Sequence, residues 1–100
     1  MKLDINMLRD KATSLGAKLM LDATASIGLE ANHELADAIS YSSCKGLFGL
    51  TGAAFIAFNN LPNFELPSFN LSIKSHLDKK MTGPYHAICS LDRILIKVLY

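Results

Sequence analysis

The chain has 100 residues, a length that allows one domain at most. Ten lysines plus arginines face nine acidic residues, so electrostatics give the chain no general attraction to nucleic acid or to anionic membranes. Half of the residues are hydrophobic and only 19% are charged, which favours a folded α/β domain over a disordered chain.

The charged N-terminal stretch leaves no room for the apolar core of a secretory signal. The apolar runs are far shorter than the roughly 20 residues that cross a bilayer. Two cysteines do not make a disulfide framework and suit a reducing compartment. We therefore expect a cytoplasmic protein that does not enter the membrane.

The first expected element is a helix over residues 4–15, because apolar residues recur there at helical spacing, Asp4 can cap its start and Gly16 can end it. The apolar run 18–22 predicts a buried strand of a parallel sheet, with Asp22 at its carboxyl end. The next segments are expected as a turn over 24–28, one or two helical turns within 30–37, a strand over 38–42, a glycine-rich loop over 43–52 and a strand over 53–58.

The character of the chain changes after residue 60. Residues 60–82 contain prolines, asparagines and serines, and a helix is expected around 71–77. Thr82, Gly83 and Pro84 predict the start of a last helix. Its apolar stripe runs to the end of the sequence through Ile88, Leu91, Leu95 and Val98. No C-cap follows, so we expect the sequence to be cut within this helix.

Two charged residues carry the chemistry that the sequence suggests. Asp22 ends one expected strand and Lys45 follows another, so both would lie at the carboxyl ends of strands, where open α/β sheets bind ligands. A lysine in a loop is usually a solvated charge. Lys45, however, has no charged neighbour between residues 38 and 58, and desolvation there would favour the neutral, nucleophilic amine. Asp22 is either the cap of a turn or a buried carboxylate that pairs with a cationic ring nitrogen.

Other kinds of site are disfavoured by their patterns. Ser42, Ser43 and Cys44 lack the G-x-S-x-G context of an activated nucleophile. A phosphate-binding loop of the Walker type would need Ser or Thr directly after Lys45, and glycine stands there. His86, in the first turn of a helix, is more typical of a surface residue. The histidines and cysteines have no paired spacing of metal ligands.

Residues 21–28, Leu-Asp-Ala-Thr-Ala-Ser-Ile-Gly, and residues 41–52, Tyr-Ser-Ser-Cys-Lys-Gly-Leu-Phe-Gly-Leu-Thr-Gly, together resemble the core of class V (fold type I) pyridoxal-phosphate aminotransferases. Within that family the sequence is most similar to the 2-aminoethylphosphonate–pyruvate transaminases. The sister group is the alanine–glyoxylate and serine–pyruvate transaminases. The resemblance extends from the first helix to residues 82–84, and the combination of the two motifs is specific where either half alone is weak.

This resemblance implies roles for four residues. Lys45 would attach pyridoxal 5'-phosphate covalently and move the proton between substrate and cofactor. Asp22 would pair with the protonated ring nitrogen, and Ser26 would line the cofactor pocket. Thr82 would approach the phosphate of the neighbouring subunit's cofactor, which suits a hydroxyl at a helix N-terminus. Cys44 departs from the family, whose members often carry a phosphate-contacting polar residue there.

The resemblance also implies the reaction. We expect amino-group transfer from 2-aminoethylphosphonate to pyruvate, giving phosphonoacetaldehyde and alanine, in an enzyme that is a homodimer at full length. One alternative is a sister transaminase of the alanine–glyoxylate or serine–pyruvate type. The other is a non-catalytic, truncated remnant.

By the same resemblance, residues 1–60 would form the second half of the cofactor-binding large domain, and residues 61–100 a connecting loop and an interface helix. The fold expected is a partial α/β domain, with a few mostly parallel strands and flanking helices, truncated at both ends. The phosphate-binding turn, the ring-stacking residue and the substrate-binding arginine of the family would lie outside this sequence. We therefore expect an internal fragment that is inactive by itself.

Overall fold

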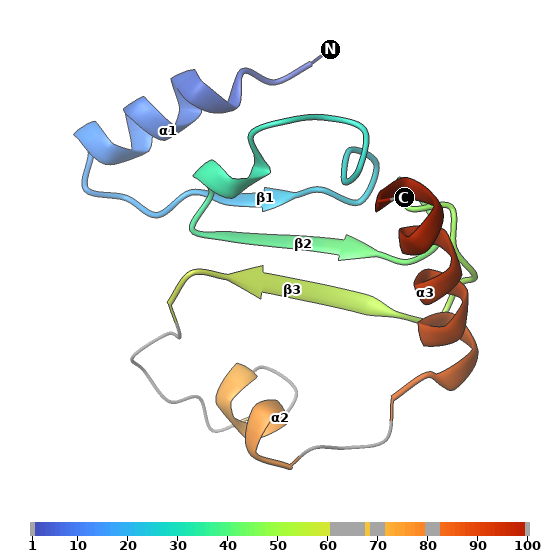
Figure 1. Ribbon diagram of the computed structural model, residues 1–100. Helices are drawn as coiled ribbons and strands as arrows, with labels where there is room; N and C mark the ends of the chain where they lie inside the picture. Colours follow the sequence, from blue (N-terminus) through green and yellow to red (C-terminus); the bar gives the residue numbers. More distant parts are fainter. Residues whose placement is uncertain (1, 61–67, 69–71, 80–82, 100) are drawn as a thin grey trace.

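The computed structural model describes residues 2–60, 68, 72–79 and 83–99, and it shows a small mixed α/β arrangement around a three-stranded sheet (Figure 1). The elements in chain order are α1 (Ile5–Ser14), β1 (Met20–Asp22), the 3-10 helix η1 (His33–Leu35), β2 (Ala38–Ser42), β3 (Ala54–Phe58), α2 (Ile73–Lys79) and α3 (Tyr85–Leu99). None of the helices in these ranges is long and apolar enough to span a bilayer.

Helix α1 forms where the spacing of apolar residues predicts it. The Asp4 carboxylate accepts a hydrogen bond of 3.1 Å from the Met7 N–H and caps the helix start. Gly16, just beyond the helix, has a φ of 65°, the left-handed conformation that commonly ends a helix. Both predicted boundaries are therefore confirmed to within one residue.

The sheet has the order β1-β2-β3 and is mixed. β1 and β2 are parallel, with Asp22 opposite Ser40, whereas β2 and β3 are antiparallel. Tyr41 and Phe55 are partners across the second pair, and their rings stack with centroids 5.1 Å apart. The expectation of mostly parallel strands is wrong for this pair. A parallel connection needs a crossover of roughly a dozen residues or more, usually a helix, and the short segment 43–53 contains none.

β1 is an exposed edge strand, which corrects the prediction of a buried one. It pairs with β2 alone in this sheet, and Met20 is 75% exposed. The segment 30–37 contains the single 3-10 turn η1, which is the lower limit of the one or two helical turns predicted there. The buried side chains of the described residues are few and mostly small: Ala23, Ala36, Ser43, Ala53, Ala87 and Leu91.

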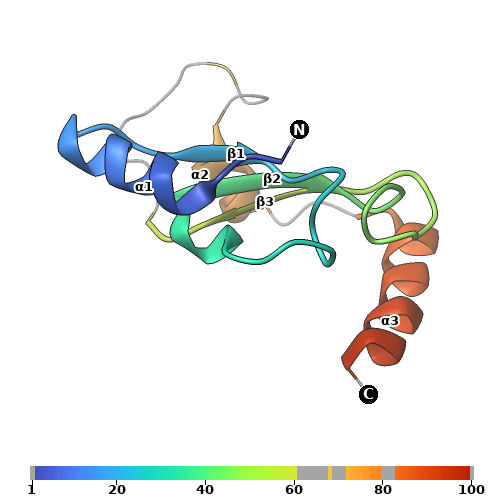
Figure 2. The ribbon, with the colours of Figure 1, turned by 90° about the horizontal axis from the view of Figure 1, so that it is seen from above.

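Helix α3 lies at the end of the sheet toward which β1 and β2 point (Figures 1 and 2). The Leu50 N–H donates a 3.0 Å hydrogen bond to the Ser90 hydroxyl on this helix. A Cβ atom built on Gly49 would lie 3.4 Å from Leu91 Cδ2, which is ordinary packing distance. α3 thus covers the segment that follows β2, where Lys45 is found.

Candidate functional site

Lys45 lies in a closely tied segment, residues 43–53, which we call the lysine loop. Ser43 at its start is fully buried, and its hydroxyl donates to the Leu50 carbonyl oxygen at 2.5 Å and accepts from the Ala53 N–H at 3.3 Å. The Ser43 carbonyl oxygen accepts from the Gly49 N–H at 2.7 Å. Ser43 therefore closes the loop on itself. A buried hydroxyl held in this way does not serve as an exposed nucleophile.

Asp22 begins a second segment, residues 22–28, which we call the Asp22 turn. Asp22 is exposed, and its Oδ1 accepts hydrogen bonds from the Thr24 hydroxyl at 2.5 Å and from the Thr24 N–H at 3.1 Å. These two bonds hold the pKa of Asp22 below its ordinary value. The structure thus gives Asp22 the turn-capping geometry, as an exposed anion and not as a buried carboxylate.

The lysine loop and the Asp22 turn touch directly. The parallel pairing of β1 and β2 brings both segments to the same edge of the sheet. There the Gly46 N–H donates a 3.0 Å hydrogen bond to the Thr24 carbonyl oxygen. A Cβ atom on Gly46 would lie only 2.8 Å from the Ile27 carbonyl oxygen, so the close approach requires glycine. The prediction that one sheet edge carries Asp22 and Lys45 is confirmed at the level of the backbone.

The Lys45 side chain itself is exposed. Among the described residues, none accepts a hydrogen bond from its amine or forms an ion pair with it. The expected desolvation of this amine is therefore wrong for the part of the chain that the structure describes. The reason is geometric, because the glycines after Lys45 are used to pack the loop against the Asp22 turn and α3 and do not enclose the amine.

Cys44, next to Lys45, has a perturbed thiol. Hydrogen bonds from Thr51 and then Ser42 hold the pKa of Cys44 below its ordinary value, in spite of partial burial that opposes the shift. The Ser42 hydroxyl lies 3.9 Å from the sulfur. Sequence reasoning did not single out Thr51, because its contact with Cys44 depends on how the loop closes.

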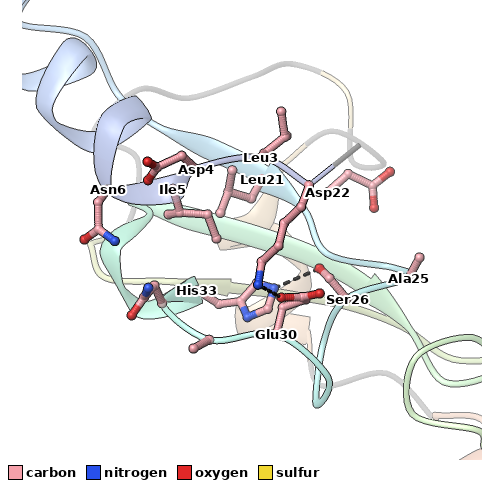
Figure 3. Close-up of a pocket in the computed structure, with 13 residues that line it drawn as sticks. Leu3, Asp4, Ile5, Asn6, Leu21, Asp22, Ala25, Ser26, Glu30 and His33 are labelled. Carbon is pink, nitrogen blue, oxygen red and sulfur yellow. Dashed lines mark hydrogen bonds and ion pairs between the residues drawn. The ribbon is translucent and has the colours of Figure 1, made fainter.

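A cavity of about 740 Å³ opens beside the Asp22 turn, between the first residues of the chain and the segment before η1. Figure 3 shows Ser26 and His33 pointing toward one another in its wall, with the Ser26 Oγ 2.8 Å from the His33 Nε2. Asp22 also lines the cavity, whereas Lys45 does not. Ser26 thus lines a cavity beside Asp22, and its role toward a cofactor stays a prediction. Its hydroxyl is bonded to His33, a histidine that no sequence pattern singled out.

The charged pair Lys2–Glu30 closes one side of this cavity at 2.6 Å, and both side chains are well exposed. Thr82, the fourth predicted site residue, lies outside the described residues.

The chemistry of these residues fits pyridoxal phosphate in part. An ionised carboxylate with one oxygen already held suits a protonated ring nitrogen, and an exposed amine at the same edge suits an aldehyde. The cavity, however, is lined by Asp22 and not by Lys45.

The structure is a mixed α/β domain in which an acid, Asp22, and an amine, Lys45, lie on adjoining loops at one end of the sheet. No model of a protein family matches the chain, and no curated protein matches it significantly.

Proposed function

We propose that this chain serves pyridoxal-phosphate-dependent transamination, with Lys45 and Asp22 acting on the same cofactor. The observation that carries the proposal is the hydrogen bond from the Gly46 N–H to the Thr24 carbonyl oxygen, 3.0 Å long. It joins the residue after Lys45 to the residue that holds Asp22. The backbones next to Asp22 and Lys45 are therefore in contact, as is required of two side chains that act on one small molecule.

The roles follow from the chemistry of each group. Pyridoxal phosphate, when bound, supplies the electron sink that makes a carbon–hydrogen bond next to an amino group acidic. Lys45 Nζ would attach the cofactor and would take up and return the proton. Asp22 would receive the ring N–H on Oδ2, because Thr24 occupies Oδ1. An anionic partner keeps that ring nitrogen protonated.

The substrates belong to the proposal as well. The resemblance favours 2-aminoethylphosphonate as amino donor and pyruvate as acceptor, in a homodimer whose second subunit approaches the cofactor phosphate through Thr82. An alanine–glyoxylate or serine–pyruvate type of reaction uses the same two residues in the same way. A coupled assay with each donor would separate these reactions.

The exposure of Lys45 supports a different candidate, a chain without catalytic activity. In that case Lys45 is an ordinary surface lysine and its amine has no special reactivity. The two candidates differ in a property of the chain itself, the relative reactivity of its lysines toward the cofactor.

The experiment is therefore covalent trapping. The chain is mixed with substoichiometric pyridoxal phosphate, reduced with borohydride, digested and mapped by mass spectrometry. The proposal predicts that Lys45 carries most of the label, ahead of Lys11 on α1, which is also exposed. Lys45→Arg should abolish this preference, and Lys11→Arg should leave it unchanged. Label spread over the lysines without preference for Lys45 would contradict the proposal and support the non-catalytic candidate.

A further inference from the structure

Thr24 makes three hydrogen bonds that involve both halves of the site. Its hydroxyl and its N–H both donate to Asp22 Oδ1, at 2.5 and 3.1 Å. Its carbonyl oxygen accepts from the Gly46 N–H at 3.0 Å. Thr24 is half-buried, between an exposed carboxylate and the backbone of the lysine loop. No other described residue bonds to both segments in this way.

The first two bonds orient the Asp22 carboxylate. Both end on the same oxygen, and no described residue donates to Oδ2. A carboxylate that is free to rotate would present either oxygen to a ligand, whereas this one presents Oδ2. The bonds also stabilise the ionised form, and accordingly the pKa of Asp22 is lowered, first by the Thr24 hydroxyl and then by the Thr24 N–H.

The third bond sets the position of the lysine loop. Gly46 lies so close to the Asp22 turn that a Cβ atom there would be 3.3 Å from the Ala25 carbonyl carbon and closer still to Ile27. A shift of the Thr24 carbonyl would therefore be passed on to Gly46 and to its neighbour Lys45. The position of the Lys45 backbone relative to the Asp22 turn therefore depends on Thr24.

We propose that Thr24 is the positioning residue of this site, which presents Asp22 Oδ2 to the N–H of a protonated aromatic ring and ties the backbone next to Lys45 to the Asp22 turn. This inference rests on the proposed function and names the residue that makes it geometrically possible. Thr24 does not touch the cofactor, so it acts through Asp22 and Gly46.

Two variants isolate the hydroxyl. Thr24→Val keeps the shape of the side chain and both backbone bonds but removes the donor to Oδ1, and Thr24→Ser keeps the donor. The first measurement is the titration of the Asp carboxyl carbons by NMR, without any cofactor. We expect the pKa of Asp22 to rise in Thr24→Val and to stay low in Thr24→Ser. Asp37, held by other partners at the opposite end of the sheet, provides the internal control.

The second measurement is the trapping of pyridoxal phosphate on Lys45. Thr24→Val should lower the trapped fraction about two- to fivefold, the range expected for a hydrogen bond to an exposed charge, and Thr24→Ser should restore it. A trapped fraction unchanged in Thr24→Val, in a protein where Lys45 is preferred, would overturn the positioning role. Equal labelling of all lysines in the unaltered chain would overturn the proposed function, and the NMR titration would still decide whether Thr24 orients Asp22.

Discussion

The two ends of the parallel strand pair each combine an acid with a base, and they do so differently. At the amino end, Asp37 accepts from the Leu19 N–H at 2.8 Å and from the Arg9 guanidinium at 2.9 Å, and Arg9 also donates to the Leu35 carbonyl oxygen. At the carboxyl end, Asp22 and Lys45 are fixed through their loops but do not pair. The Arg9–Asp37 ion pair connects α1 to the start of β2. Asp22 and Lys45 form no such pair with one another, so both charged groups are available to a ligand.

This difference extends to the backbone around the two ends. The lysine loop depends on a fully buried serine and on glycines that approach other atoms too closely for a side chain. The amino end depends on one ion pair, whose two side chains are only 23% and 30% exposed. Substitutions at the two ends should therefore weaken the protein through different physical causes.

The largest effect is expected for Gly46→Ala. The added Cβ would lie 2.8 Å from the Ile27 carbonyl oxygen, a backbone atom that cannot move aside without moving the Asp22 turn. We expect the free energy of unfolding to fall by about 2 kcal/mol or more in urea denaturation. Gly83→Ala is the matched control, because its Cβ would meet only the flexible end of Ile88. Equal losses in the two variants would contradict the close packing of the loop.

The second largest loss of stability is expected for Ser43→Ala. It leaves the Leu50 carbonyl oxygen and the Ala53 N–H without their buried partner, so we expect a loss of about 1–3 kcal/mol of unfolding free energy. Ser40→Ala, at an exposed position on β2, should change stability by no more than about 0.5 kcal/mol. The measurement is again the urea midpoint, and a stable Ser43→Ala variant would show that the loop does not need its internal hydrogen bonds.

Asp37→Asn tests the amino end through pH. Hydrogen bonds from Leu19 and Arg9 hold the pKa of Asp37 below its ordinary value of about 3.9. A lowered pKa means that the ionised carboxylate stabilises the fold fully above the ordinary value and loses this effect as pH falls through the lower one. The variant should therefore be less stable than the unaltered chain near neutral pH, and the difference should shrink in acid. A difference that does not change between pH 7 and the acid range would contradict this account.

The smallest effect is expected at Cys44, because it concerns reactivity and not folding. Thr51→Val removes the first of the hydrogen bonds that lower the thiol pKa. The alkylation of Cys44 by iodoacetamide should then require a higher pH, since the thiolate is the reactive form. Cys89, an exposed cysteine on α3, should react in the same way in Thr51→Val and in the unaltered chain. An unchanged pH profile for Cys44 would show that Thr51 does not act on it.

The sequence predicted much of this fold because the signals were local. Asp4 and Gly16 bound α1 by capping chemistry, and the second strand was predicted over its full range of 38–42. The antiparallel direction of β3 was missed, because an apolar run has the same composition in either direction. The exposure of β1 was missed for a similar reason. The hydrophobicity of a strand indicates that it can be buried, but it does not indicate which element would cover it.

The site was predictable in its members but not in its contacts. Asp22 and Lys45 lie at the same end of the sheet as predicted, because each ends or follows a strand and the segment 23–37 is long enough for the parallel connection of β1 and β2. The Ser26–His33 and Ser43–Leu50 hydrogen bonds each close a turn between residues seven positions apart, and the Gly46–Thr24 bond joins two separate segments. No periodicity or motif predicts how those turns close, so these contacts were not predicted.

The central claim is that Asp22 and Lys45 act on one ring. It is tested most directly by trapping two aldehydes on Lys45, pyridoxal phosphate and salicylaldehyde, which has no ring nitrogen. Asp22→Asn should lower the trapping of pyridoxal phosphate about two- to fivefold and leave that of salicylaldehyde unchanged, while Asp78→Asn on α2 changes neither. Equal effects of Asp22→Asn on both aldehydes, or none on either, would contradict the claim.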